Sequence, residues 1–135
     1  LCAALDHCKL LKEEYGHRGG DAVLREFTRR MALALREYDS LGRYGGEELM
    51  VVLPACSVDN ARDIAERIRS AVCRERIDTG GASVAVSVSI GVALLGEGSR
   101  APFAQLIQFA DAALYEAKRR GRNQVVFAAD PGAPR

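Results

Sequence analysis

A pair of adjacent glycines, Gly45 and Gly46, lies between two short apolar runs. Both positions accept positive φ without steric cost, so the pair predicts a tight turn that joins two antiparallel strands. A turn without side chains also lets a large ligand approach the backbone. Two acids, Glu47 and Glu48, follow the glycines and are expected to point to opposite sides of the strand.

Two interpretations fit this hairpin when it is considered alone. A carboxylate beside a bare turn can hold a divalent cation over a bound phosphate. A surface hairpin with solvated acids fits equally well, because short motifs recur by chance. The rest of the chain is therefore needed to choose between a ligand site and a plain surface turn.

Composition indicates one ordinary globular domain. The chain has 135 residues, of which 48% are hydrophobic and 27% are charged, enough to form a real core. The net charge of +1 gives no overall field that would attract nucleic acid or a membrane surface. No apolar run is long enough to span a bilayer, and no secretory signal is visible. The cysteines lack metal-ligand spacing and are expected to be free thiols of a cytoplasmic protein: Cys2, Cys8, Cys56 and Cys73.

Apolar periodicity predicts alternating strands and helices along the whole chain. Asp21 is a suitable N-cap for the second predicted helix, and the β-branched run from Ser83 to Leu95 predicts a long central strand. We expect a strand over 1–5, a short helix over 8–15 ending near Gly16, a helix over 22–38, strands over 40–44 and 48–53 joined at Gly45-Gly46, a helix from Ser57 or Asp59 to Arg74, the strand from Ser83 to Leu95, a helix from Pro102 to Gly121, and a strand over 124–127.

This order, β-α-β-β-α-β-α-β, contains the β-α-β-β-α-β core of the ferredoxin-like arrangement. That core has a mostly antiparallel sheet with helices on one face. We therefore expect an α+β fold.

Four ordered segments together span nearly the whole chain. They are Tyr15-Gly16-His17-Arg18-Gly19-Gly20-Asp21; Gly45-Gly46-Glu47-Glu48-Leu49; Ser87-Val88-Ser89-Ile90-Gly91-Val92-Ala93; and the stretch from Ala110 to Asn123. In this order and spacing they resemble the sequence signature of the GGDEF family, the diguanylate cyclases, with Leu49 in place of the usual aromatic residue, and they are far more specific than a single motif. The resemblance implies the palm-like fold of nucleotide cyclases and polymerases, an α/β sandwich with a mainly antiparallel sheet flanked by helices.

The resemblance also implies a reaction, in which two GTP molecules form cyclic di-GMP and release two pyrophosphates. Two Mg²⁺ or Mn²⁺ ions would neutralise the triphosphate and lower the pKa of the attacking hydroxyl. Each of two facing domains would carry one GTP, so catalysis would need a homodimer. An upstream sensory or receiver domain is expected in the full-length bacterial protein.

Family roles transfer to the hairpin position by position. Glu47 matches the metal-binding acid, and Glu48 matches the residue that assists the second metal or the attacking hydroxyl. Gly45 and Gly46 match the turn that approaches the phosphates and ribose.

Three further residues match substrate contacts. Asp21 matches the acid that hydrogen-bonds the edge of guanine, although a helix cap alone would also explain it. Lys118 and Arg122 match the basic pair that grips the terminal phosphates, although cations are also favourable at the end of a helix without any ligand.

Two departures from the family pattern predict weakened chemistry. The first metal-binding Asp of the family is Ala4 here, which leaves the Leu5 carbonyl and Asp6 as possible substitutes. The guanine-reading Asn of the family is Lys12, which donates hydrogen bonds but cannot accept them. Loss of one preorganised electrostatic group costs about 10²-fold in rate. We therefore expect a crippled or inactive cyclase.

A second ligand site is predicted just before the hairpin. Arg36 and Asp39 match the family's Arg-x-x-Asp inhibitory site for cyclic di-GMP, and Arg67 matches its secondary arginine. Arginine suits this role because its planar guanidinium binds phosphate in a bidentate manner and stacks on guanine. An ordinary surface ion pair between residues three apart is the alternative for Arg36 and Asp39.

Three functions remain open at this point. The chain could be a diguanylate cyclase domain, a non-catalytic domain that binds cyclic di-GMP or GTP, or a plain dimerisation module. The retained ligand-type residues argue against the third. Residues 1–128 are expected to form the domain, truncated before Leu1 because the family's preceding helix is absent, and 129–135 to form a flexible tail.

Overall fold

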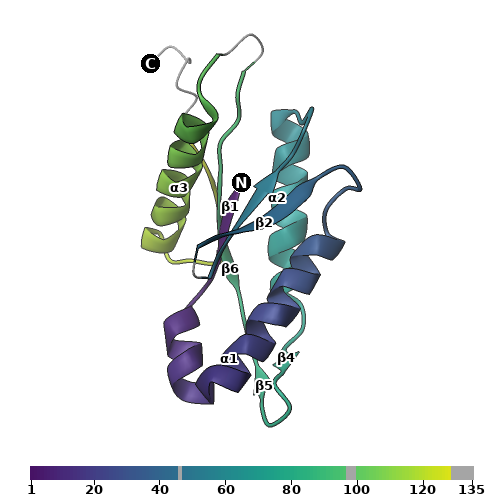
Figure 1. Ribbon diagram of the computed structural model, residues 1–135, viewed down its shortest axis with the longest axis vertical. Coiled ribbons are helices and arrows are strands. Elements are labelled where there is room, and N and C mark those ends of the chain that lie inside the picture. Colours follow the sequence, from purple (N-terminus) through teal and green to yellow (C-terminus); the bar gives the residue numbers. More distant parts are fainter. Residues whose placement is uncertain (46, 97–99, 129–135) are drawn as a thin grey trace.

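The computed structural model describes residues 1–45, 47–96 and 100–128 (Figure 1). The predicted order of elements is confirmed, with one additional short hairpin. The predicted tail, 129–135, lies outside the described residues. The elements are β1 (Cys2–Leu5), α1 (Cys8–Leu33), β2 (Ser40–Gly45), β3 (Glu48–Val52), α2 (Val58–Cys73), β4 (Ile77–Asp78), β5 (Ser83–Val84), β6 (Val88–Val92), α3 (Phe103–Arg119) and β7 (Val125–Phe127).

A mainly antiparallel sheet forms the centre of the molecule. Its strand order is β2-β3-β1-β6-β7. The central strand β1 is antiparallel to both β3 and β6, and β7 alone among these is parallel to its neighbour. In this register Ala4 lies opposite Glu48 on one side and Ser89 on the other. The α+β prediction is confirmed, and the strand at the N-terminus does lie beside the glycine hairpin.

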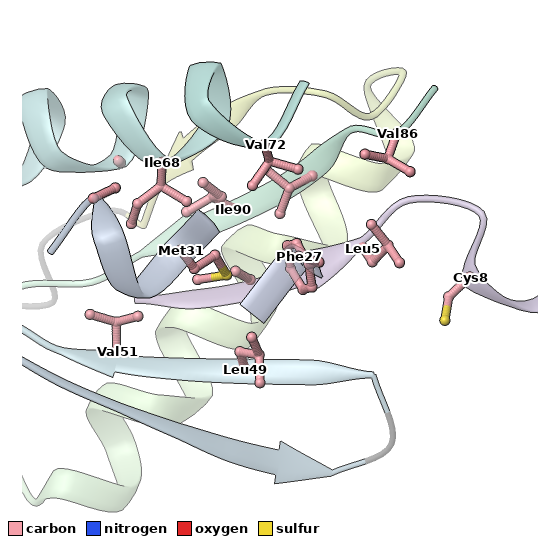
Figure 2. Packing of buried hydrophobic residues seen from close by; sticks show 14 of the residues in the cluster. Leu5, Cys8, Phe27, Met31, Leu49, Val51, Ile68, Val72, Val86 and Ile90 are labelled. Carbon is pink, nitrogen blue, oxygen red and sulfur yellow. The ribbon is translucent and has the colours of Figure 1, made fainter. Parts of the chain in front are cut away.

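Helices cover both faces of the sheet (Figure 1). The main core lies on the face covered by α1 and α2, where Phe27, Met31 and Ile68 pack against Leu5 and Ile90 (Figure 2). The two helices of the ferredoxin-like core, α1 and α2, thus share one face as expected, and α3, which follows that core in the chain, covers the opposite face.

Small side chains bring α3 close to the sheet. Cys2 and Ala4 of β1 pack against Ala110 and Leu114 of α3. A Cβ at Gly91 of β6 would overlap the Ala110 carbonyl oxygen and the Leu114 backbone nitrogen. The close approach of α3 therefore depends on glycine at this position.

Helix α1 departs from the two separate helices that we predicted. Gly16 adopts a positive φ of 73° and kinks the helix, which then continues to Leu33 instead of starting at 22 and ending at 38. Asp21 therefore lies inside the helix and is not its N-cap. Gly19 and Gly20 are helical and allow close packing of neighbouring side chains, because added Cβ atoms would lie 2.6 Å from Tyr15 Cβ and 2.8 Å from Lys12 Cγ.

The long strand predicted from Ser83 to Leu95 is split in two. Ser83–Val84 forms a separate small sheet with Ile77–Asp78, across a turn in which Gly80 has φ of 89°. The central strand begins only at Val88. The β-branched composition correctly indicated strand, but it did not reveal where the small hairpin ends and the central strand begins.

The second half of the chain otherwise follows the prediction. The Ser57 side chain accepts a hydrogen bond from the Asn60 backbone N–H and caps α2. Pro102 precedes α3, and Gly121 follows its end with φ of 118°. Within the described ranges, no helix combines the length and apolar character needed to cross a membrane.

Candidate functional site

The glycine hairpin turns one residue later than predicted. Gly45 is the partner of Glu48 across the two strands, so Glu47 lies in the turn itself. The register shifts between Arg43 and Gly45, which marks an irregularity in β2 next to the turn. Gly46, predicted to contact substrate, lies outside the described residues.

The two acids lie on opposite faces of the sheet, as alternation along a strand predicts. Glu47 lines a pocket of about 410 Å³ on the α1 side, together with Asp21. This volume is within the range of small-molecule sites. The structure thus brings the predicted metal-binding acid and the predicted guanine-binding acid to one cavity, whose remaining lining residues are Leu24, Arg25, Phe27, Thr28, Leu41, Gly42, Arg43 and Leu49.

Glu48 lies on the α3 side, in an acidic environment. Burial raises the pKa of its carboxyl to about 7, and a hydrogen bond and the charge of Asp111 add to the effect. Lys118 opposes the shift, while Glu47 adds to it. This part of the site favours positive charge, because an added cation would stabilise the ionised carboxylate.

Ala4 is the residue that the resemblance matches to the family's first metal-binding Asp. It is 1% exposed, lies under α3, and faces Glu48 across the strand pair. Directly opposite side chains on neighbouring strands are close enough to interact. An acid at this position would therefore have stood next to Glu48.

Oxygen donors for a divalent cation are present but few. In the part of the chain that the structure describes, there is no group of three or more His, Cys, Asp or Glu side chains suited to a metal ion. Glu47 and Glu48 still fit Mg²⁺, which usually takes one or two carboxylates together with substrate phosphates.

Asp6, predicted as a possible substitute ligand, points elsewhere. Its side chain is buried and accepts hydrogen bonds from the hydroxyls of Ser87 and Ser89, both at 2.6 Å. The Asn123 backbone N–H donates to the same carboxylate at 3.0 Å. These partners direct both oxygens toward the protein interior.

The three basic residues predicted to bind substrate lie on different elements. The side chain of Lys12 lies close over Gly20, next to Asp21 in the chain. Lys118, in the last turn of α3, is near enough to Glu48 to lower its pKa. Arg122 follows the end of α3, is exposed, and has φ of 65°.

A larger cavity, of about 890 Å³, lies at the other end of β3, between the start of α2 and α3. Its lining is mostly apolar and includes Met50, Leu94, Phe103 and Ile107. The hairpin acids do not line it, so the smaller, charged pocket is the candidate site.

Comparison with known proteins agrees with this geometry. A family model described as "Diguanylate cyclase, GGDEF domain" matches residues 1–124. The chain belongs to the GGDEF family. Diguanylate cyclase DosC of Escherichia coli (strain K12) is 39% identical over 126 residues, covering 93% of this chain and 27% of DosC. The chain spans about a third or less of the length of its curated relatives.

Solved GGDEF structures share the fold closely. Diguanylate cyclase SiaD of Pseudomonas aeruginosa, crystallised with its activator SiaC, matches with a TM-score of 0.87 and 38% identity, covering 94% of this chain and 48% of SiaD. The GGDEF domain of DgcB from Caulobacter crescentus, in complex with c-di-GMP, matches with a TM-score of 0.85 and 29% identity, covering 93% of this chain and 74% of that one.

The Arg-x-x-Asp segment of this GGDEF domain forms a compact cluster between α1 and β2. Arg36 donates to Asp39 through Nε and Nη2, the latter at 2.8 Å, and its Nη2 also donates to the Pro54 carbonyl. The Arg36 guanidinium lies 4.5 Å from the centre of the Tyr38 ring. Arg67 donates to the Ala34 carbonyl and lies near enough to lower the pKa of Asp39. The structure thus brings the three predicted residues together.

Several residues around the site were not predicted. Asp111 stands next to Glu48, although it belongs to the segment from Ala110 to Asn123 that carried the resemblance. Ser87, just before β6, and Ser89, within it, also lie in a resembling segment, and their spacing of two residues could have indicated a shared polar partner. Burial of Asp6 between them could not be inferred from spacing.

Proposed function

We propose that this GGDEF domain binds GTP at the hairpin site and is a weakened diguanylate cyclase. The observation that carries the proposal is Ala4, buried opposite Glu48 where the family has a metal-binding carboxylate. Retention of Glu47, Asp21, Lys118 and Arg122 supports GTP as the ligand. The loss at position 4 supports impaired turnover.

In this proposal each remaining residue has a separate task. Asp21, in the pocket beside α1, accepts hydrogen bonds from the guanine edge. Lys12 donates to guanine acceptors but cannot accept from guanine donors, so base binding is weakened. Lys118 and Arg122 bind the terminal phosphates through charge-assisted hydrogen bonds.

Glu47 and the Leu5 carbonyl would hold Mg²⁺ or Mn²⁺, and Glu48, on the α3 side, would assist a second metal or the attacking hydroxyl. When bound, the metal supplies charge neutralisation at the triphosphate and makes the 3′-hydroxyl more acidic. Asp6 is not assigned to this set, because its carboxylate oxygens accept protein hydrogen bonds.

The reaction would require two copies of the domain. In each, the 3′-hydroxyl of one GTP attacks the α-phosphorus of the other, and pyrophosphate leaves. We therefore propose a homodimer, brought together by a further domain of a longer cytoplasmic protein. The greater length of the relatives is consistent with such a domain.

A forced dimer tests this function. The domain would be fused to a dimeric coiled coil, stripped of nucleotide and incubated with GTP and either Mg²⁺ or Mn²⁺, with mass spectrometry to quantify cyclic di-GMP. We expect GTP binding in a separate titration, with product near the level of a Glu47→Ala control. Abundant Glu47-dependent product would contradict impairment, and absence of GTP binding would contradict the substrate site.

A second candidate function is binding of cyclic di-GMP at Arg36, Asp39 and Arg67. Their grouping in one cluster favours it, because two guanidinium groups beside a carboxylate can bind both phosphate and the guanine edge. Titration of cyclic di-GMP against wild type and Arg36→Ala tests this site independently of catalysis. Equal affinity in both proteins would exclude it.

A further inference from the structure

A buried acid without a place in the proposed reaction lies directly after β1. Asp6 is 4% exposed. The three groups that donate hydrogen bonds to its side chain are all more than 80 residues away in the sequence. Ser89 donates to Oδ1, whereas Ser87 and the Asn123 backbone N–H both donate to Oδ2. A carboxylate so well satisfied stabilises the segments that supply its donors.

One of those segments is the loop that carries Arg122. Arg122 and Asn123 both adopt left-handed conformations, with φ of 65° and 48°. Such a conformation is uncommon for residues other than glycine and persists only where the surroundings hold it. Asp6 supplies that hold from the sheet side through the Asn123 N–H.

Two further contacts fix the same loop. The Arg122 backbone N–H donates to the Ala117 carbonyl at 3.0 Å, which ties the loop to the end of α3. The Asn123 side-chain oxygen accepts from Arg69 Nη1 of α2 at 3.1 Å. The loop is thus fixed by contacts with α2, α3 and the sheet. Of these three contacts, the one with Asp6 is made by a buried charge.

We propose that Asp6 is a positioning residue for Arg122. By fixing the left-handed pair Arg122-Asn123, it directs the Arg122 guanidinium toward the terminal phosphates of the nucleotide. This role rests on the proposed GTP site, and it gives Asp6 a function other than the metal binding expected from the sequence.

The charge of Asp6 is essential to this role. A carboxylate accepts at both oxygens, whereas an amide of the same shape has one acceptor and one donor. In Asp6→Asn, either the Asn123 N–H or a serine hydroxyl therefore loses an acceptor. Hydrogen bonds to charged groups are stronger than neutral ones. We therefore expect about a 10-fold loss of affinity for a ligand whose binding depends on the position of this loop.

The test compares nucleotides that differ in their terminal phosphates. GTP and GMP affinities would be measured by calorimetry for wild type, Asp6→Asn, Arg122→Ala and the double variant. We expect Asp6→Asn to weaken GTP about 10-fold and leave GMP unchanged, with no further loss of GTP affinity in the Arg122→Ala background. Amide exchange at Asn123, followed by NMR, should become faster in Asp6→Asn.

The outcomes separate this role from the proposed function. Wild type that fails to bind GTP overturns the proposed function, and the Asp6 role with it. Wild type that binds GTP while Asp6→Asn loses GTP and GMP affinity equally, or adds its full effect to Arg122→Ala, overturns the Asp6 role alone. If Asp6→Asn does not fold, Ser87→Ala replaces it: it removes one donor to the same Oδ2 atom, and a smaller selective loss for GTP is expected.

Discussion

Glu48 and Asp39 are carboxylates of one small domain with opposite electrostatics. Burial and Asp111 raise the pKa of Glu48 to about 7. Burial also acts to raise the pKa of Asp39, but hydrogen bonds from the Arg36 side chain and backbone N–H outweigh it and leave that pKa below its usual value. The Glu48 side of the hairpin thus carries unbalanced negative charge, whereas the Arg36 cluster contains its own counter-charge.

This difference indicates how each region would bind a ligand. At the hairpin, a bound cation would relieve the repulsion between Glu48 and Asp111, so we expect a divalent metal to strengthen nucleotide binding there. In the other region, Arg36 already donates to Asp39 and Pro54. An anionic ligand there would have to share or exchange these contacts. Because the arginines already supply the positive charge, we expect such a ligand to bind without metal.

The largest expected effect tests the missing charge at the hairpin. Ala4→Asp should raise cyclic di-GMP production by the forced dimer about 10²-fold, because it restores a carboxylate beside Glu48. Mass spectrometry measures the product, and Ala4→Asn is the matched control of equal size without the charge. Equal rates for Ala4→Asp and Ala4→Asn would show that a carboxylate at this position is not the limiting feature.

The next effect concerns the Arg36 cluster. Arg36→Ala should weaken cyclic di-GMP binding about 10-fold or more, since charge-assisted contacts to phosphate are lost, and should leave GTP affinity unchanged. Calorimetry in EDTA measures both affinities. Arg29→Ala is a suitable control, because Arg29 also pairs with an acid three residues away but lies on the exposed side of α1. A similar loss in Arg29→Ala would assign the effect to overall charge.

Stability provides a smaller effect of defined sign. Asp39→Asn should lower the free energy of unfolding by about 1–2 kcal/mol at pH 7, because the Asp39 side chain is 0% exposed and accepts bonds from Arg36. Its pKa is lowered in the folded state, so the contribution is present above the unfolded pKa and is lost as pH falls through the folded pKa. Urea unfolding at pH 7 and pH 3 should show the difference shrinking in acid. A constant difference would exclude a charge effect.

Glu48→Gln should shift stability in the opposite direction, and least of all. The folded-state pKa of Glu48 is raised to about 7, so the folded state binds extra protons from the ordinary glutamate value upward and loses stability as pH rises through that window. In EDTA at pH 8 the variant should be more stable than wild type by about 1 kcal/mol or less, since partial exposure screens the charges. The gain should vanish near pH 4 in urea unfolding, and a gain of equal size at both pH values would contradict a raised pKa.

The fold was largely predictable because strong local signals agreed with one another. The hairpin at Gly45 and the cap at Ser57 both appear where the sequence places them, within one residue. The prediction failed between Gly16 and Asp21. Gly16 does kink the chain, but Gly19 and Gly20 are helical and lie close to Tyr15 and Lys12, so the helix continues through Asp21.

The sequence predicted which residues belong to the candidate site, but not where each side chain points. The resemblance to the family assigned Glu47 and Asp21 to one site, and both residues line the same pocket. Spacing could not reveal that Asp6 turns toward Ser89 and Asn123, because these partners are more than 80 residues away. Long-range hydrogen bonds of this kind depend on sheet order, which local patterns do not specify.

The contact at Gly91 has a consequence for how this domain can diverge. A side chain there would meet backbone atoms of α3, and no rotamer change can move a backbone aside. A substitution would have to be accompanied by displacement of the whole helix, including Asp111 and Lys118. Variation should therefore accumulate on the outer surface of α3, as at the exposed Gln108, while the helix and β6 are inherited as one unit.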